Sequence, residues 1–262
     1  MSLVSRVLAC AVTVTAAVTV AAVTGCATTG VPYQRPSSTT AAPAPTAAAP
    51  SPAAPMTPLP AASGQLTGTQ LQTVLLPQSF FPAGFTLSPS AAVSSGAGLT
   101  SAPPQYDLAK IGCATFVNHL GNTGFGETAM ASATAVGQRQ AFDQVVYQFR
   151  SPEAASAFVS GIESLARRCG SFTAIDNGAR GMFSLKAAPG PPVGGHPSLE
   201  LTQTGELNGA ALTLDTLLTA SGVDVFAGAA AGLGSGAPAG LARETIVYNL
   251  MKRQAAAAIL GS

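Results

Sequence analysis

Hydrophobic and polar residues alternate along much of the chain after residue 64, a pattern that indicates short strands. Residues 128–136 and 141–149 form two such runs, and apolar residues at every second position mark the buried side of the second run. Further strand-like runs lie at residues 171–175, 182–187, 199–207, 211–220 and 223–227. A stretch rich in Pro and Gly, residues 189–197, interrupts them and is predicted to be a loop.

The clearest helix signal lies at residues 151–168. Ser151 can accept a hydrogen bond from a free amide, Pro152 suits the first helical position, and Glu153 favours the positive end of the helix dipole. An apolar stripe follows at helical spacing. It consists of Phe158, Ile162 and Leu165.

Two further helix signals flank the predicted strands. Residues 65–76 present apolar side chains on one face, and residues 239–260 do so at Val247, Leu250 and Met251. Strands outnumber helices, and tight turns join several of them. These observations predict an α+β domain, built from an antiparallel sheet with helices packed on one side.

The first 63 residues differ in composition from the predicted domain. Residues 1–25 combine a charged start at Arg6 with an apolar run that ends in small residues, which is typical of a signal peptide. Residues 26–63 are almost wholly Ala, Pro, Thr, Ser and Gly, so they cannot bury enough apolar surface to fold. We therefore expect a signal peptide at 1–25, a disordered tether at 26–63 and the α+β domain at 64–262.

The end of the signal peptide carries a candidate modification site. The four residues from Val23 to Cys26 resemble the lipobox of bacterial lipoproteins, in which small residues precede the cysteine that accepts the lipid. The resemblance implies that Cys26 is acylated, and two or more acyl chains anchor a protein stably. The expected location is the extracytoplasmic face of the cell membrane. An ordinary secretory signal with an incidental Cys26 is the alternative.

Cysteine parity predicts one disulfide in the domain. Of four cysteines, Cys10 lies in the signal peptide and Cys26 carries the lipid, so Cys113 and Cys169 remain as a pair. Thiols outside the cytoplasm are oxidised, and a disulfide is the default for such a pair. A catalytic pairing of cysteine with His119 stays open as an alternative. No metal site is expected, because neither histidine lies at a ligand spacing.

Charge is scarce and balanced, which narrows the classes of partner and chemistry. The chain has 12 Lys and Arg against 11 Asp and Glu. Nucleic-acid binding needs clustered Lys and Arg, so no nucleic-acid partner is expected. The segment Gly232–Ala237 superficially matches a dinucleotide fingerprint, but the chain ends too soon for the acidic residue that completes such a site. Without a nucleophile or metal signature, neither a cofactor nor enzymatic activity is expected.

Other polar residues form no recognisable constellation. Asp215 and Asp224 lie on adjacent predicted strands, a placement that scattered acidic residues produce by chance. His196 is expected in an exposed loop, between Gly195 and Pro197 in the sequence. Arg180 and Lys186 could receive an anionic ligand, although a solvated surface role is the expectation.

Three features together resemble one protein family. They are the Leu75–Phe85 segment that ends in Phe-Pro-Ala-Gly-Phe, a cysteine before a pair of strands, and the block Val145–Ala155 that leads to Cys169. This combination resembles the actinobacterial sensor-domain lipoproteins, which are similar to the extracellular sensor domain of mycobacterial serine/threonine kinase H. The resemblance implies an α+β domain with a disulfide-tied helix and a ligand-binding cleft. The chain departs from the pattern in its single cysteine pair and in Arg167-Arg168, where Trp is common, and no binding residue can be transferred.

Two functions from different classes are consistent with these observations. The first is a non-catalytic sensor or ligand-binding domain at the cell surface, which takes a small molecule or cell-wall fragment in a largely apolar pocket. The alternative is a module that binds another envelope protein through an exposed apolar patch.

Overall fold

The computed structural model describes residues 64–94, 106–120, 123–137, 140–176, 179–207, 210–233 and 239–260. The predicted signal peptide and tether, with Cys10 and Cys26, lie outside the described residues. The elements in chain order are α2 (Gly68–Gln72), the 3-10 helix η1 (Gln78–Phe80), β1 (Thr86–Ser94), α3 (Cys113–His119), β2 (Ala129–Val136), β3 (Gln140–Gln148), α4 (Pro152–Arg168), β4 (Phe172–Asp176), β5 (Ala179–Val193), β6 (His196–Leu207), β7 (Ala210–Ser221), β8 (Asp224–Leu233) and α5 (Ala239–Leu260). No helix within these ranges is both long and apolar enough to cross a membrane.

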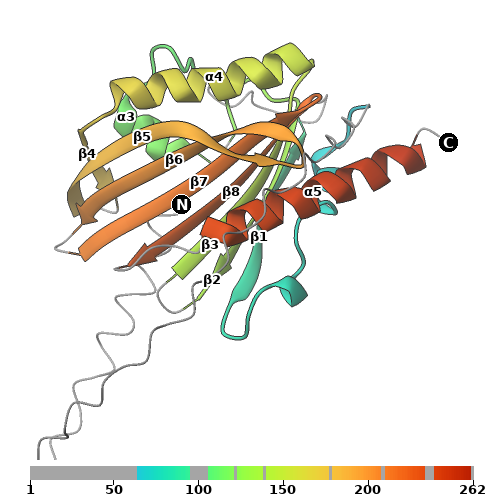
Figure 1. Cartoon of the computed structure of the whole chain (residues 1–262), viewed down its shortest axis with the longest axis horizontal. Coiled ribbons are helices and arrows are strands. Elements are labelled where there is room, and N and C mark those ends of the chain that lie inside the picture. Colours follow the sequence, from blue (N-terminus) through green and yellow to red (C-terminus); the bar gives the residue numbers. More distant parts are fainter. Residues whose placement is uncertain are drawn as a thin grey trace, which may run out of the picture.

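The strands of the described residues join in one 8-stranded antiparallel sheet, in the order β1-β2-β3-β8-β7-β6-β5-β4. It consists of two meanders, β1–β3 and β4–β8, which meet where β3 pairs with β8. The predicted α+β class and antiparallel sheet are therefore confirmed (Figure 1).

Helix α4 connects the two meanders by crossing the sheet from β3 to the far edge at β4 (Figure 1). Its 17 residues span about 25 Å, which matches five inter-strand spacings of about 4.8 Å. It begins as the sequence predicts, with Pro152 in its first turn and the Ser151 hydroxyl accepting a hydrogen bond from the Ala154 amide at 3.3 Å. The predicted apolar stripe is buried against the sheet.

Helices pack against both faces of the sheet, which differs from the expected placement on one side. On one face, which we call the α4 face, α3 and α4 cover Val145 and Tyr147 of β3. On the opposite face, the α5 face, α2 and α5 cover Phe142 and Val146 of the same strand. Strand β3 is buried along nearly all of its length, so both of its faces need a covering layer.

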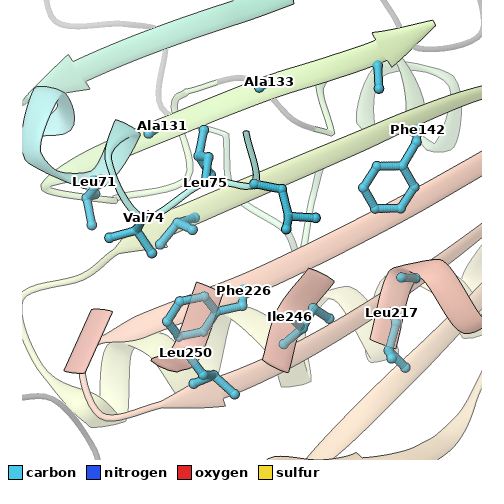
Figure 2. Packing of buried hydrophobic residues seen from close by; sticks show 14 of the residues in the cluster. Leu71, Val74, Leu75, Ala131, Ala133, Phe142, Leu217, Phe226, Ile246 and Leu250 are labelled. Carbon is cyan, nitrogen blue, oxygen red and sulfur yellow. The ribbon is translucent and has the colours of Figure 1, made fainter. Parts of the chain in front are cut away.

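The inner side of α5 packs on β8. Figure 2 shows Ile246 and Leu250 beside Phe226, and Ala242 belongs to the same cluster. These three helix residues recur every four positions, and this stripe defines the buried side of α5. Met251, predicted to lie on the apolar face, is instead 58% exposed because it falls outside that stripe.

The predicted loop at residues 189–197 is mostly strand. β5 continues to Val193 and β6 begins at His196, around a two-residue turn in which Gly194 and Gly195 have φ values of 57° and 81°. The prolines on β5, Pro189, Pro191 and Pro192, are tolerated because β4 pairs only with residues 179–183 of that strand. Beyond residue 183 no described strand pairs with the outer side of β5. A proline there, which has no amide N–H, therefore breaks no hydrogen bond between strands.

The predicted helix at residues 65–76 is shortened to α2. Its flanks bond to buried side chains of β3 instead: the Gln148 side-chain oxygen accepts from the Leu66 amide at 2.9 Å. Gln144 accepts from the Leu76 amide at 2.8 Å and donates to the Leu76 carbonyl at 3.1 Å. These two glutamines fasten the N-terminal segment, residues 64–76, to the middle of the sheet.

Candidate functional site

A cleft of about 240 Å³ lies between the beginning of α5 and the neighbouring strands of the α5 face. Helix α5 packs mainly on β8, so the α5 face of β5, β6 and β7 remains partly accessible beside it (Figure 1). The lining residues are Pro191, Glu200, Asp215, Thr216, Leu217, Ala242 and Arg243.

Close backbone approaches shape the base of the cleft. A Cβ atom on Gly228 of β8 would lie 3.0 Å from the Ala242 carbonyl oxygen, so glycine allows α5 to sit directly on the strand. A Cβ atom on Gly190 of β5 would lie 2.8 Å from Cδ1 of Leu217. Leu217 and Ala242 are only 6% and 3% exposed, and they form an apolar floor.

Two carboxylates stand on the sheet side of the cleft. In the β6–β7 register Glu200 opposes Leu217 and Asp215 opposes Thr202, so the acidic residues are diagonal neighbours on one face. Both side chains are half-buried. The sheet therefore presents a negatively charged wall next to the apolar floor.

Helix α5 supplies the opposite charge. Arg243 directly follows the floor residue Ala242 and is exposed at the cleft. Among the ion pairs of the described residues, none joins Arg243 to Glu200 or Asp215. The cleft thus carries one cation and two anions that do not neutralise each other by direct contact.

The structure separates the two aspartates that the sequence places on adjacent strands. Asp215 reaches the cleft, whereas Asp224 is buried at the beginning of β8. Its carboxylate accepts hydrogen bonds from Arg253 Nε at 2.9 Å and from the Gln148 side chain at 3.2 Å. Burial raises the pKa of Asp224 to about 6, against the opposing influence of Arg253 and Gln148. Arg253 also donates to the Gly64 carbonyl, so this network joins α5 to the N-terminal segment.

The remaining polar candidates lie outside the cleft. Arg180 and Lys186 are exposed on β5. His196 is not in an exposed loop as expected: it begins β6, is half-buried, and its Nε2 atom lies 3.1 Å from the Ser221 hydroxyl.

A disulfide joins Cys113 and Cys169, the pair that cysteine parity predicts. Cys113 begins α3, a helix that the sequence pattern does not predict, and Cys169 caps the end of α4. Both sulfurs are therefore committed to the bridge rather than to a nucleophilic pair with His119. The imidazole of His119 instead lies 3.1 Å from the Tyr106 hydroxyl.

Arg168 is the second residue of the Arg167-Arg168 pair that precedes Cys169. Its guanidinium donates to the carbonyls of Ala109 at 2.6 Å and Leu108 at 2.9 Å. Arg167 pairs with Glu163 one turn earlier, at 2.7 Å. Arg168 therefore joins the segment before α3 to the end of α4, Arg167 bonds within α4, and neither residue lines the cleft.

The sequence does not single out Glu200, Leu217, Ala242 or Arg243. Alternation in residues 199–204 separates Glu200 from its buried leucine neighbours, and this signal could have placed it on the accessible face. The register between β6 and β7, and the approach of α5 to the same face, depend on tertiary packing that the local pattern does not encode.

The described domain is an eight-stranded antiparallel sheet crossed by α4, and a disulfide joins the end of that helix to α3. The structure is similar to the extracellular domain of PknH from Mycobacterium tuberculosis, with a TM-score of 0.51 and 18% identity over 71% of this chain and 97% of that chain. An uncharacterised protein from Mycobacterium smegmatis matches with a TM-score of 0.44 and 14% identity, over 74% and 98% of the two chains. No protein-family model and no curated protein matches the sequence. The similarity to a mycobacterial kinase sensor domain, expected from the sequence, is confirmed at the level of the fold.

Proposed function

We propose that this chain is a cell-surface lipoprotein, anchored through Cys26, whose domain at residues 64–262 is a non-catalytic sensor that binds a small ligand. The observation that carries the proposal is the cleft beside α5, with its apolar floor and charged walls. Small-molecule sites typically combine an apolar lining with a few polar groups that orient the ligand. The fold similarity to the extracellular domain of PknH supports the extracytoplasmic location in this proposal.

Thermal unfolding of the full purified chain, with its disulfide intact, tests ligand binding. The ligand panel contains cell-wall fragments, lipids, sugars and small metabolites. A ligand at one hundred times its dissociation constant should add about 2.7 kcal/mol to the free energy of unfolding. For a domain of this size we expect the midpoint to rise by several degrees.

A matched pair of variants locates the bound ligand. Pro191→Trp places a large side chain at the cleft wall, whereas Pro192→Trp changes the adjacent exposed residue, which is not part of the lining. We expect the first variant to abolish the ligand-induced shift and the second to retain it. Equal shifts in both variants, or no shift with any compound, would contradict binding in this cleft.

A second candidate function is docking to another envelope protein. Ile175 of β4 and Met182 of β5 are 61% and 66% exposed and are diagonal neighbours at the edge of the sheet. Contiguous exposed apolar surface marks protein contact sites, and these two neighbouring side chains would form the centre of such a surface. If this function holds, Ile175→Ser with Met182→Ser should abolish a crosslink to the partner in intact envelopes, while the cleft variant Pro191→Trp should preserve it.

A further inference from the structure

We infer that the cleft binds a small zwitterion, namely an α-amino acid or dipeptide with an apolar side chain. Its ammonium group would lie against Glu200 and Asp215, and its carboxylate against Arg243. This inference rests on the proposed ligand-binding function and names the chemical class of the ligand.

Charges of opposite sign on the two sides of the cleft indicate a ligand that carries both charges. The two carboxylates belong to strands of the sheet, and the guanidinium belongs to the helix on the other side. No ion pair of the described residues joins the two sides. A ligand with an ammonium at one end and a carboxylate at the other can contact both walls at once. Each contact would be a charge-assisted hydrogen bond, and guanidinium groups bind carboxylates in a two-pronged geometry.

The apolar floor of the cleft indicates that the ligand also has an apolar side chain. Leu217 and Ala242 lie between the charged walls and are almost fully buried. An apolar side chain on the ligand would contact this floor, and the exposed Pro191 at the cleft wall provides further apolar surface for it to cover. A purely polar ligand, such as a free sugar, would leave the floor without a matching contact.

The volume of the cleft limits the size of the ligand. A volume of about 240 Å³ lies just below the range of roughly 300–1,000 Å³ that is typical of small-molecule sites. This space suits an amino acid or a dipeptide rather than a long polymer. An anionic ligand faces two carboxylates, and a cationic ligand has no group to pair with Arg243, so neither contacts both walls through opposite charges.

Isothermal titration calorimetry on the full purified chain tests the inference with leucine and leucyl-alanine, which distinguish an amino acid from a dipeptide. Each probe is compared with its N-acetyl form, which lacks the ammonium, and its C-terminal amide, which lacks the carboxylate. We expect at least one zwitterion to bind, and each single modification to weaken its binding at least tenfold. Equal binding of the zwitterion and its modified forms would overturn the inference.

Charge-neutral variants then assign each end of the ligand. Glu200→Gln combined with Asp215→Asn should weaken the binding of the zwitterion. The double variant should then no longer bind the zwitterion more tightly than its N-acetyl form. Arg243→Gln should remove the preference over the amide. The controls are Glu206→Gln on β6 and Lys252→Gln on α5, which are exposed and outside the lining, and both should bind as the unmodified chain does. Circular dichroism melting confirms that each variant is folded.

The outcome also separates this inference from the proposed function. If neither zwitterion binds but a ligand of another class raises the unfolding midpoint through the cleft, the zwitterion inference fails and the sensor function stands. If no compound of any class binds, the proposed function fails together with it.

Discussion

Arg253 and Asp224 form an ion pair inside the domain, with side-chain exposures of 1% and 0%. Such a pair is costly to bury, and its value lies in the geometry that it imposes. Here it links α5, β8 and, through Gln148 and Gly64, the N-terminal segment. Removing one partner would leave the other as an uncompensated buried charge.

Arg253→Met should therefore destabilise the protein strongly at neutral pH, because it leaves the Asp224 carboxylate buried without its cation. We expect the free energy of unfolding to fall by about 3–5 kcal/mol, measured by urea denaturation at pH 7. The double variant Asp224→Asn with Arg253→Met removes both charges and should recover much of this loss. If the double variant is as unstable as the single variant, the pair does not act as a unit.

The same carboxyl group predicts a pH dependence. Burial raises the pKa of folded Asp224 from 3.8 to about 6, so between these values the folded state binds a proton more readily than the unfolded state. The stability contributed by this group is present at low pH and is lost as pH rises through 6. Relative to Asp224→Asn, the unmodified chain should gain stability as pH falls from 7 to 4. The opposite slope would show that the contact with Arg253 outweighs burial.

At the scale of elements, the close packing of α5 on β8 depends on Gly228. A Cβ atom there would meet the backbone of Ala242 at 3.0–3.1 Å, and backbone atoms have little freedom to move away. We expect Gly228→Ala to lower the free energy of unfolding by about 1–3 kcal/mol. The displaced helix should also weaken ligand binding, because Ala242 and Arg243 line the cleft.

Gly170→Ala is the matched control for this prediction, because a Cβ atom at Gly170 would have no neighbour within 4 Å. Both substitutions restrict the unfolded chain in the same way, so their difference isolates the contact with α5. Urea denaturation of the two variants provides the measurement. Equal urea midpoints for the two variants would contradict close packing of α5 on Gly228.

The disulfide ties α3 to the end of α4 and closes a loop of 56 residues in sequence separation. Replacing Cys113 and Cys169 with Ser should lower the free energy of unfolding by about 4 kcal/mol in the chain-entropy model. Urea denaturation with and without a reductant checks this, since the reductant should affect only the unmodified chain. A reductant-insensitive midpoint in that chain would contradict the prediction.

Elements with strong local signals were predictable, and those shaped by distant contacts were not. α4 carries its own cap and apolar stripe, and β2 and β3 show clear alternation, so their positions follow from the sequence. By contrast, α2 is short because Gln144 and Gln148 bond to the residues on either side of it. Strand β5 continues through its prolines because its outer edge is unpaired there. Of the cleft residues, the sequence draws attention only to Asp215, because strand register and helix packing bring the others together.

At the scale of the whole molecule, the predicted location depends on Cys26. Cys26→Ser should abolish labelling by a palmitate analogue and shift the protein from the membrane fraction to the aqueous fraction, because the acyl chains supply the membrane affinity. Cys10→Ser changes a cysteine of the signal peptide and should leave both properties intact. Retention of the label in Cys26→Ser would place the lipid elsewhere.

The fastening of residues 64–76 has a mechanical consequence for a domain held at the membrane by its N-terminus. A pull on the proposed tether arrives at Gly64 and Leu66, and their side-chain partners are Arg253 and Gln148. Gln148 belongs to β3, which has a paired strand on each side. Tension is therefore delivered to an interior strand and has to shear the middle of the sheet instead of peeling an edge. The same pull also reaches α5 through Arg253, so the tether is linked mechanically to the helix that carries the cleft residues Ala242 and Arg243.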